Sequence, residues 1–188
     1  MLRRVRPRRR LEGLSMVEVA AIVCLVGVLL AVFIPAFLRE LRTSKTSEAT
    51  EHLGLLYQRS AAYFAARRAQ EDGPALTRCL PRAAGPTPRA PSEEPREVDF
   101  ADERLPGSAT WRALEFAPRI PLRYSYTFEP TASGCGLRSP DGTYLLTLRA
   151  EGDLDGDGER SIFERRARAN EDGDLEPSDI LYVHDRVE

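Results

Sequence analysis

The chain has 188 residues, enough for one compact domain with an added segment but too few for two ordinary domains. Its formal net charge is −2, which excludes a strongly basic nucleic-acid-binding protein, and no nucleic-acid partner is predicted. The charge is uneven, because six arginines stand against one glutamate in residues 1–13 and the rest of the chain is correspondingly acidic.

An apolar segment follows this basic start. The residues from Val19 to Leu38 carry no charge. A helix of that length, at about 1.5 Å per residue, spans about 30 Å, the thickness of one hydrocarbon core. Arginines before such a segment indicate the cytoplasmic side. The sequence therefore predicts one membrane-spanning helix, with the C-terminal remainder outside the cytoplasm.

Three interpretations of the N-terminus compete. A secretory signal has an apolar core of about 7–15 residues and a small-x-small cleavage site, whereas this segment is longer, has no A-x-A pattern after it and contains Pro35 near its end. A plain signal anchor explains the arginines and the length but not Glu18. An acid in a membrane span costs roughly 2.5–3.5 kcal/mol at the centre and less near the interface, so such a residue indicates a function.

The third interpretation accounts for the acid. The residues Gly13-Leu14-Ser15-Met16-Val17-Glu18, with a basic leader before them and an apolar segment after them, resemble the class III signal of type IV pilins and pseudopilins. The resemblance implies that a prepilin peptidase removes residues 1–13 by cutting after Gly13. It also implies that the peptidase methylates the new N-terminal residue, Leu14.

The resemblance assigns a role in assembly to Glu18, Gly27 and Pro35, which match the family's acid, glycine and proline positions. In a filament of pilins the acid pairs with the freed amine of a neighbouring subunit, which offsets its cost in the membrane. Gly27 weakens the helix by about 1 kcal/mol relative to alanine, and Pro35 removes a backbone donor. Considered singly, Gly27 also fits close helix packing and Pro35 a simple kink.

The helix is expected to continue beyond the membrane. Apolar residues recur at roughly 3.6-residue spacing, and residues 72–74, Asp-Gly-Pro, form a stop signal. We therefore expect one helix from Leu14 to about Gln70. Its membrane and assembly part covers residues 14–38, and its amphipathic part lies within residues 39–72.

The remaining residues predict a small sheet behind an irregular loop. Residues 73–121 contain nine prolines and are expected to form a variable loop, pinned to the fold by anchors such as Trp111. Alternating runs at 122–128 and 143–149 predict strands, and 180–183 predicts a third. The expected fold class is α+β and pilin-like, with the long helix packed on an antiparallel sheet formed within residues 122–188.

An acidic stretch within the predicted sheet matches the D-x-D-x-D-G-x5-E pattern of calcium loops. The predicted ligands are Asp153, Asp155, Asp157, Glu159 through its carbonyl, Ser161 through its hydroxyl or a water, and Glu164. Alternate carboxylates would point at one hard cation, and Gly158 would take the sharp turn. A structural calcium ion is expected, and the alternative is an acidic surface turn without metal.

The cysteines predict a disulfide. Cys24 lies in the apolar segment as a small hydrophobic residue. Cys79 and Cys135 both fall in the exported part, where a disulfide can form and persist, so we expect them to be paired. The alternative is two unpaired buried thiols.

Catalysis is not expected. The two histidines, His52 and His184, have no nearby nucleophile or metal-ligand spacing in the sequence, and there is no phosphate-binding glycine loop.

The resemblance implies a structural subunit of a type IV pilus or of a type II secretion pseudopilus. Its partners would be identical or related pilin subunits, the prepilin peptidase and the inner membrane, with the globular part in the periplasm or, in an assembled pilus, outside the cell. The alternative is an inner-membrane-anchored periplasmic module that binds calcium and never assembles, which would need neither Gly13 nor Glu18.

Overall fold

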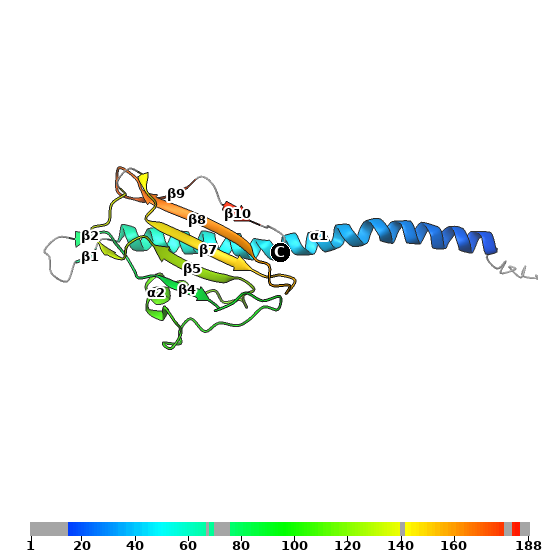
Figure 1. The fold of residues 1–188 in the computed structure, drawn as a ribbon, viewed down its shortest axis with the longest axis horizontal. Coiled ribbons are helices and arrows are strands. Elements are labelled where there is room, and N and C mark those ends of the chain that lie inside the picture. The colour runs from blue at the N-terminus through cyan, green and yellow to red at the C-terminus, as the bar shows by residue number, and fades with distance from the viewer. Residues whose placement is uncertain (1–14, 67, 70–75, 140–141, 179–181, 185–188) are drawn as a thin grey trace, which may run out of the picture. The chain divides into compact units, whose positions relative to one another are not determined.

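A computed structural model describes residues 15–66, 68–69, 76–139, 142–178 and 182–184 (Figure 1). The chain divides into two compact units, residues 1–41 and 42–188, and each is described by itself. We call residues 42–188 the head. Helix α1, Met16–Ala65, contributes its first part to the N-terminal unit and its second part to the head.

The first part of α1 confirms the predicted apolar helix. Its residues Met16–Phe37 have a mean hydropathy of 2.9, and none of this segment is buried within the chain. Among the described residues it is the one helical segment whose length and composition suffice to cross a membrane. Pro35 lies inside the helix.

The second part of α1 supplies one wall of the core of the head. Ala49, Leu53, Leu56 and Phe64 are all fully or almost fully buried, which confirms the predicted amphipathic stripe. The helix ends at Ala65 and not near Gln70. After Phe64 the sequence offers two exposed alanines and two arginines, so further helical turns would bury no apolar surface.

The second layer of the head is a six-stranded sheet in which all pairs are antiparallel, as predicted (Figure 1). Its strands are β4 (Ala84–Thr87), β5 (Ser125–Pro130), β7 (Leu146–Gly152), β8 (Ser161–Ala169), β9 (Leu175–Pro177) and β10 (Tyr182–His184). The order across the sheet is β10-β8-β7-β5-β4, and β9 also pairs with β8.

The three predicted strands are present as β5, β7 and β10, and β5 and β7 begin later along the chain than expected. β5 starts at Ser125 because the backbone N–H groups of Arg123 and Tyr124 donate to the side chain of Glu48 on α1 and not to a neighbouring strand. The longest strand, β8, was missed. Its sequence, SIFERRARA, is rich in charge, and its start was assigned to the calcium loop.

The proline-rich region contains more regular structure than predicted. β4 carries Pro86 and lies at an edge of the sheet, where proline is tolerated because an edge strand leaves some N–H groups unpaired. The other short elements are β1 (Arg68–Ala69) with β2 (Leu76–Thr77), β3 (Cys79–Leu80) with β6 (Gly134–Cys135), and α2 (Ser108–Ala113).

The core of the head lies between α1 and the sheet and is rich in aromatic side chains. Trp111 and Phe116 are fully buried, as expected of anchors, and their ring centroids are 5.4 Å apart. The Trp111 indole N–H donates to the hydroxyl of Thr87 on β4 at 3.1 Å. The region between the helix and the central strands is therefore pinned to the core, as predicted.

Candidate functional sites

The first turn of α1 places Glu18 beside Ser15. The Ser15 backbone N–H and hydroxyl both donate to Oε2 of Glu18, at 2.8 Å and 2.9 Å, and the Glu18 N–H donates back to the Ser15 hydroxyl oxygen at 3.3 Å. This reciprocal pair is a capping box, which satisfies backbone donors at a helix start. Its S-x-x-E spacing is visible in the sequence, and sequence reasoning missed it.

Gly27, another predicted assembly residue on α1, has no packing partner in the described part of this chain beyond its own helix. Apart from its chain neighbours and the nearby backbone of its own helix, no described atom lies within 4 Å of the position that a side chain at Gly27 would occupy. A packing role for Gly27 would therefore involve another molecule. Gly13 and Leu14, the predicted processing residues, lie outside the described residues.

The acidic loop between β7 and β8 brings three of the predicted ligands together. One carboxylate oxygen from each of Asp153, Asp155 and Asp157 lies within 4.8 Å of the others. Each carboxylate also accepts a hydrogen bond from a backbone N–H of the loop, at 2.8 to 3.4 Å. Gly158 has φ of 92°, as expected of the residue at the sharp turn.

The structure does not bring Glu164 to this cluster, and it places Ser161 at the start of β8. Both residues belong to β8, where the chain rises about 3.3 Å per residue away from the loop. Ser161 is fully buried at the base of the loop. Glu164 is 5% exposed and accepts from Arg149 on β7, its cross-strand neighbour, and from Arg166.

Glu93, which is far from the acidic loop in the sequence and so outside the calcium-loop pattern, lies near the loop in the structure. The carboxylate oxygen Oε2 of Glu93 is 3.8 Å from the position of a side chain at Gly156, and Glu93 comes from the proline-rich region. Glu159 contributes its N–H to Asp157. The cluster therefore offers three converging carboxylates with a fourth nearby, a hard oxygen donor set of the kind that calcium prefers.

The predicted disulfide is confirmed. Cys79 and Cys135 are bonded, and they stand directly opposite each other in the β3–β6 pair. Because 56 residues separate them in the sequence, the bridge ties the proline-rich region to the segment between β5 and β7. Cys24 is a free, exposed thiol.

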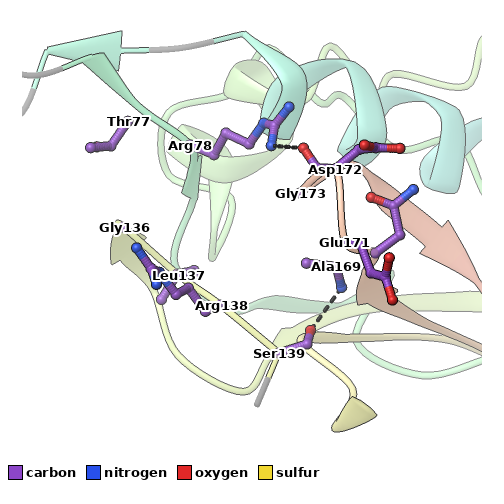
Figure 2. Close-up of a pocket in the computed structure, with 11 residues that line it drawn as sticks. Thr77, Arg78, Gly136, Leu137, Arg138, Ser139, Ala169, Glu171, Asp172 and Gly173 are labelled. Atoms are coloured by element: carbon purple, nitrogen blue, oxygen red, sulfur yellow. Dashed lines mark hydrogen bonds between the residues drawn. The ribbon is translucent and has the colours of Figure 1, made fainter. Parts of the chain in front are cut away.

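A polar cavity of about 500 Å³ lies beside the disulfide (Figure 2). Figure 2 shows Arg78 on one side of it, Ser139 on another, and residues of the β8–β9 turn on a third. Arg78 donates to the carbonyl of Asp172 and to the carboxylate of Asp174, both at 2.8 Å. Gly173 has φ of 78°, and a side chain there would collide with the Arg78 guanidinium.

This cavity was not predicted, because its walls come from three segments far apart in the sequence. Its arginines, Arg78 and Arg138, are balanced by Glu171 and Asp172, so its charge selects no ligand class. Among its lining residues there is no nucleophile held by a general base. The cavity therefore gives no support to an enzymatic activity.

Comparison with known proteins identifies a relative for this chain. The type IV major pilin protein PilA of Myxococcus xanthus (strain DK1622) is 28% identical to it over 136 residues, which make up 72% of this chain. The expected resemblance to the type IV pilins is confirmed. The matched region makes up 44% of that pilin, so the chain aligns with less than half of its relative.

The structure agrees with this resemblance at the level of the fold. A long apolar N-terminal helix and an antiparallel sheet form the α+β, pilin-like layout that the sequence predicted. No family model and no solved structure matches the chain.

Proposed function

We propose that this protein is a structural subunit of a type IV pilus or of a related type II secretion pseudopilus. The similarity to a major pilin over most of the chain is the observation that carries the proposal. The apolar segment Met16–Phe37 supports it, because an exposed surface of this kind has to be covered by lipid or by neighbouring helices. The partners are then identical or related pilin subunits and the inner membrane, with the head in the periplasm before assembly.

Processing by a prepilin peptidase is part of this proposal. The motif around Gly13 supports cleavage after this glycine, followed by methylation of Leu14. Intact-mass analysis of the native protein tests this step, and the expected chain begins at methylated Leu14. Gly13→Val should leave the protein inserted in the membrane and uncut. A Gly13→Val chain that still begins at Leu14 would contradict the proposal.

Glu18 is proposed to contact the N-terminal amine of a neighbouring subunit. The two hydrogen bonds that Glu18 accepts from Ser15 both use Oε2. A carboxylate accepts at both oxygens, so the capping box leaves Glu18 able to bind a further donor. The cap also holds the carboxylate at the start of the helix, where its charge is favourable with respect to the helix dipole.

We further propose that the acidic loop binds a structural calcium ion through Asp153, Asp155 and Asp157. The convergence of their oxygens supports this ligand set, whereas the ion pairs of Glu164 argue against its inclusion. The positive charge of the ion would offset the repulsion between the three neighbouring carboxylates. Bound calcium should therefore stabilise the turn that joins β7 to β8.

The alternative function is an inner-membrane-anchored module that binds calcium and never assembles. The acidic loop favours it as much as it favours a pilus subunit, so the loop does not distinguish them. The N-terminus distinguishes the two functions, because a membrane anchor needs neither cleavage after Gly13 nor an acidic residue at position 18. A native protein that keeps residues 1–13 would favour the alternative.

A further inference from the structure

The head contains a buried titratable group, His52, to which the proposed function assigns no role. His52 on α1 is 8% exposed, and its Nδ1 lies 3.0 Å from the hydroxyl oxygen of Tyr126 on β5. The same hydroxyl lies 3.3 Å from Oε1 of Glu48, one helical turn before His52. These three side chains form a line of polar groups in the packed interface between helix and sheet, which we call the Glu48–Tyr126–His52 chain.

The Tyr126 hydroxyl has one proton and three acceptors within reach, which are Nδ1 of His52, Oε1 of Glu48 and, at 3.4 Å, the backbone carbonyl of Glu48. Burial raises the pKa of Tyr126, so its hydroxyl stays protonated at all ordinary pH values. Glu48 is held in place independently, because its Oε1 also accepts from the backbone N–H groups of Arg123 at 2.9 Å and Tyr124 at 3.2 Å. The orientation of the Tyr126 hydroxyl therefore depends on whether Nδ1 of His52 is bare or carries a proton.

The switch requires the neutral ring to carry its proton on Nε2, because only this tautomer makes the two protonation states of His52 require opposite hydrogen bonds. A neutral ring with a bare Nδ1 accepts the proton of the Tyr126 hydroxyl. A protonated ring donates from Nδ1 to the Tyr126 oxygen, and the hydroxyl then has to turn toward Oε1 of Glu48. Protonation thus reverses the His52–Tyr126 hydrogen bond and turns the Tyr126 O–H toward Glu48.

The surroundings of His52 favour the neutral ring. Burial lowers the pKa of His52, whereas the negative charges of Glu48 and Glu51 on the same helix act in the opposite direction and are outweighed. From the sheet, β5 presents the uncharged hydroxyl of Tyr126, and the segment after α2 presents the ring of Phe116, whose centroid lies 6.4 Å from that of His52. A proton on His52 is therefore placed in a mostly apolar site.

We propose that the Glu48–Tyr126–His52 chain is an acid-sensitive switch in the head, in which protonation of His52 turns the Tyr126 hydroxyl to Glu48 and weakens the packing of α1 on the sheet. An unfolded histidine binds a proton near pH 6.5. The buried ring binds it only at lower pH, so the unfolded state takes up the proton first. The stabilisation is complete above about pH 6.5 and declines as the pH falls toward the pKa of the folded state.

The first test measures the protonation of His52 directly. The chain has two histidines, so NMR of the full-length protein in detergent micelles, with labelled histidine rings, gives two signals that His184→Gln assigns. The His52 signal should titrate with a midpoint below 6.5. Glu48→Gln should lower it further, because the protonated ring loses a nearby anion. A midpoint at or above 6.5, or one that Glu48→Gln does not move, would overturn the switch.

The second test measures the consequence for stability. Trp111 is the only tryptophan and is fully buried in the head, so its fluorescence reports urea unfolding of this unit in the full-length protein. Between pH 7.5 and 5.5 the unfolding equilibrium constant of the wild type should rise, by at most tenfold for each unit that separates the folded and unfolded pKa of His52. His52→Gln keeps a polar side chain that does not titrate, and it should lose that rise. An equal pH dependence in both proteins would overturn the proposal.

Discussion

The N-terminal segment and the head use their residues in different ways. In Met16–Phe37 the side chains are not buried by the chain, and single polar positions such as Glu18 stand out against an apolar background. In the head, each important contact joins distant segments, as when Glu48 on α1 accepts from the backbone that leads into β5. Changes in the first region should therefore alter insertion or assembly and leave the fold intact. Changes in the head should alter stability and leave insertion intact.

The largest effect should come from Glu18→Leu. The substitution makes the span more apolar, so membrane insertion should persist or improve. Incorporation into filaments, measured beside the wild type, should fall severely because the proposed contact of Glu18 with a neighbouring amine is lost. Trp111 fluorescence should show an unchanged head.

Val19→Leu is the matched control, since it changes an adjacent residue without changing charge. It should assemble like the wild type. If Glu18→Leu also assembles like the wild type, then the capping box with Ser15 is the whole role of Glu18, and the first region carries no assembly signal at this position.

The second effect concerns the disulfide in the head. A bridge that closes a loop of about 57 residues stabilises a fold by about 4 kcal/mol in the chain-entropy model. Cys79→Ser with Cys135→Ser should therefore lower the urea midpoint of Trp111 fluorescence strongly, while membrane insertion is unchanged. Cys24→Ser, in the apolar segment, should leave the midpoint unchanged. Equal midpoints for all three proteins would show that the bridge contributes nothing to the head.

The third effect separates a buried carboxylate from an exposed one. Glu164 has a side chain 6% exposed between Arg149 and Arg166, so Glu164→Gln should cost about 2 kcal/mol by leaving charged donors with a neutral acceptor. Glu103 pairs with Arg112 but its side chain is 79% exposed, and Glu103→Gln should cost no more than about 0.5 kcal/mol. Equal losses in urea denaturation would contradict the structural role assigned to Glu164.

The smallest effect is the response to calcium. Extracellular calcium sites have dissociation constants of about 10⁻⁴–10⁻³ M, and ten times that concentration adds about 1.4 kcal/mol of stability. Millimolar calcium should raise the melting midpoint of the full-length protein relative to chelator, and Asp155→Ala should abolish the rise.

Glu164→Gln distinguishes the sequence pattern from the structure at this site. The pattern makes Glu164 a ligand, whereas the structure pairs it with arginines, so we expect Glu164→Gln to keep the calcium response. Loss of the calcium response in Glu164→Gln would show that Glu164 is a ligand, as the sequence pattern predicts. No response in the wild type would leave the loop as an acidic turn.

The sequence predicted the features that depend on neighbours along the chain. The apolar helix follows from an uninterrupted uncharged run, and the buried stripe of Leu53, Leu56 and Phe64 follows from helical spacing. The antiparallel sheet followed from alternation in two runs, although β5 begins later than predicted. The Cys79–Cys135 pairing could be predicted from the sequence, because these two cysteines remained once Cys24 was assigned to the apolar segment.

Tertiary structure alone decided what joins distant segments. The sequence pattern placed Glu164 in a loop. In the structure its segment pairs with β7 and forms β8, and an ion pair with the cross-strand Arg149 compensates the buried charge of Glu164. Likewise, Glu93 lies near the acidic loop and His52 meets Tyr126 only because the chain folds back on α1. Local pattern cannot contain these contacts, since each depends on the register of a strand or the rotation of a helix, which packing of the whole core fixes.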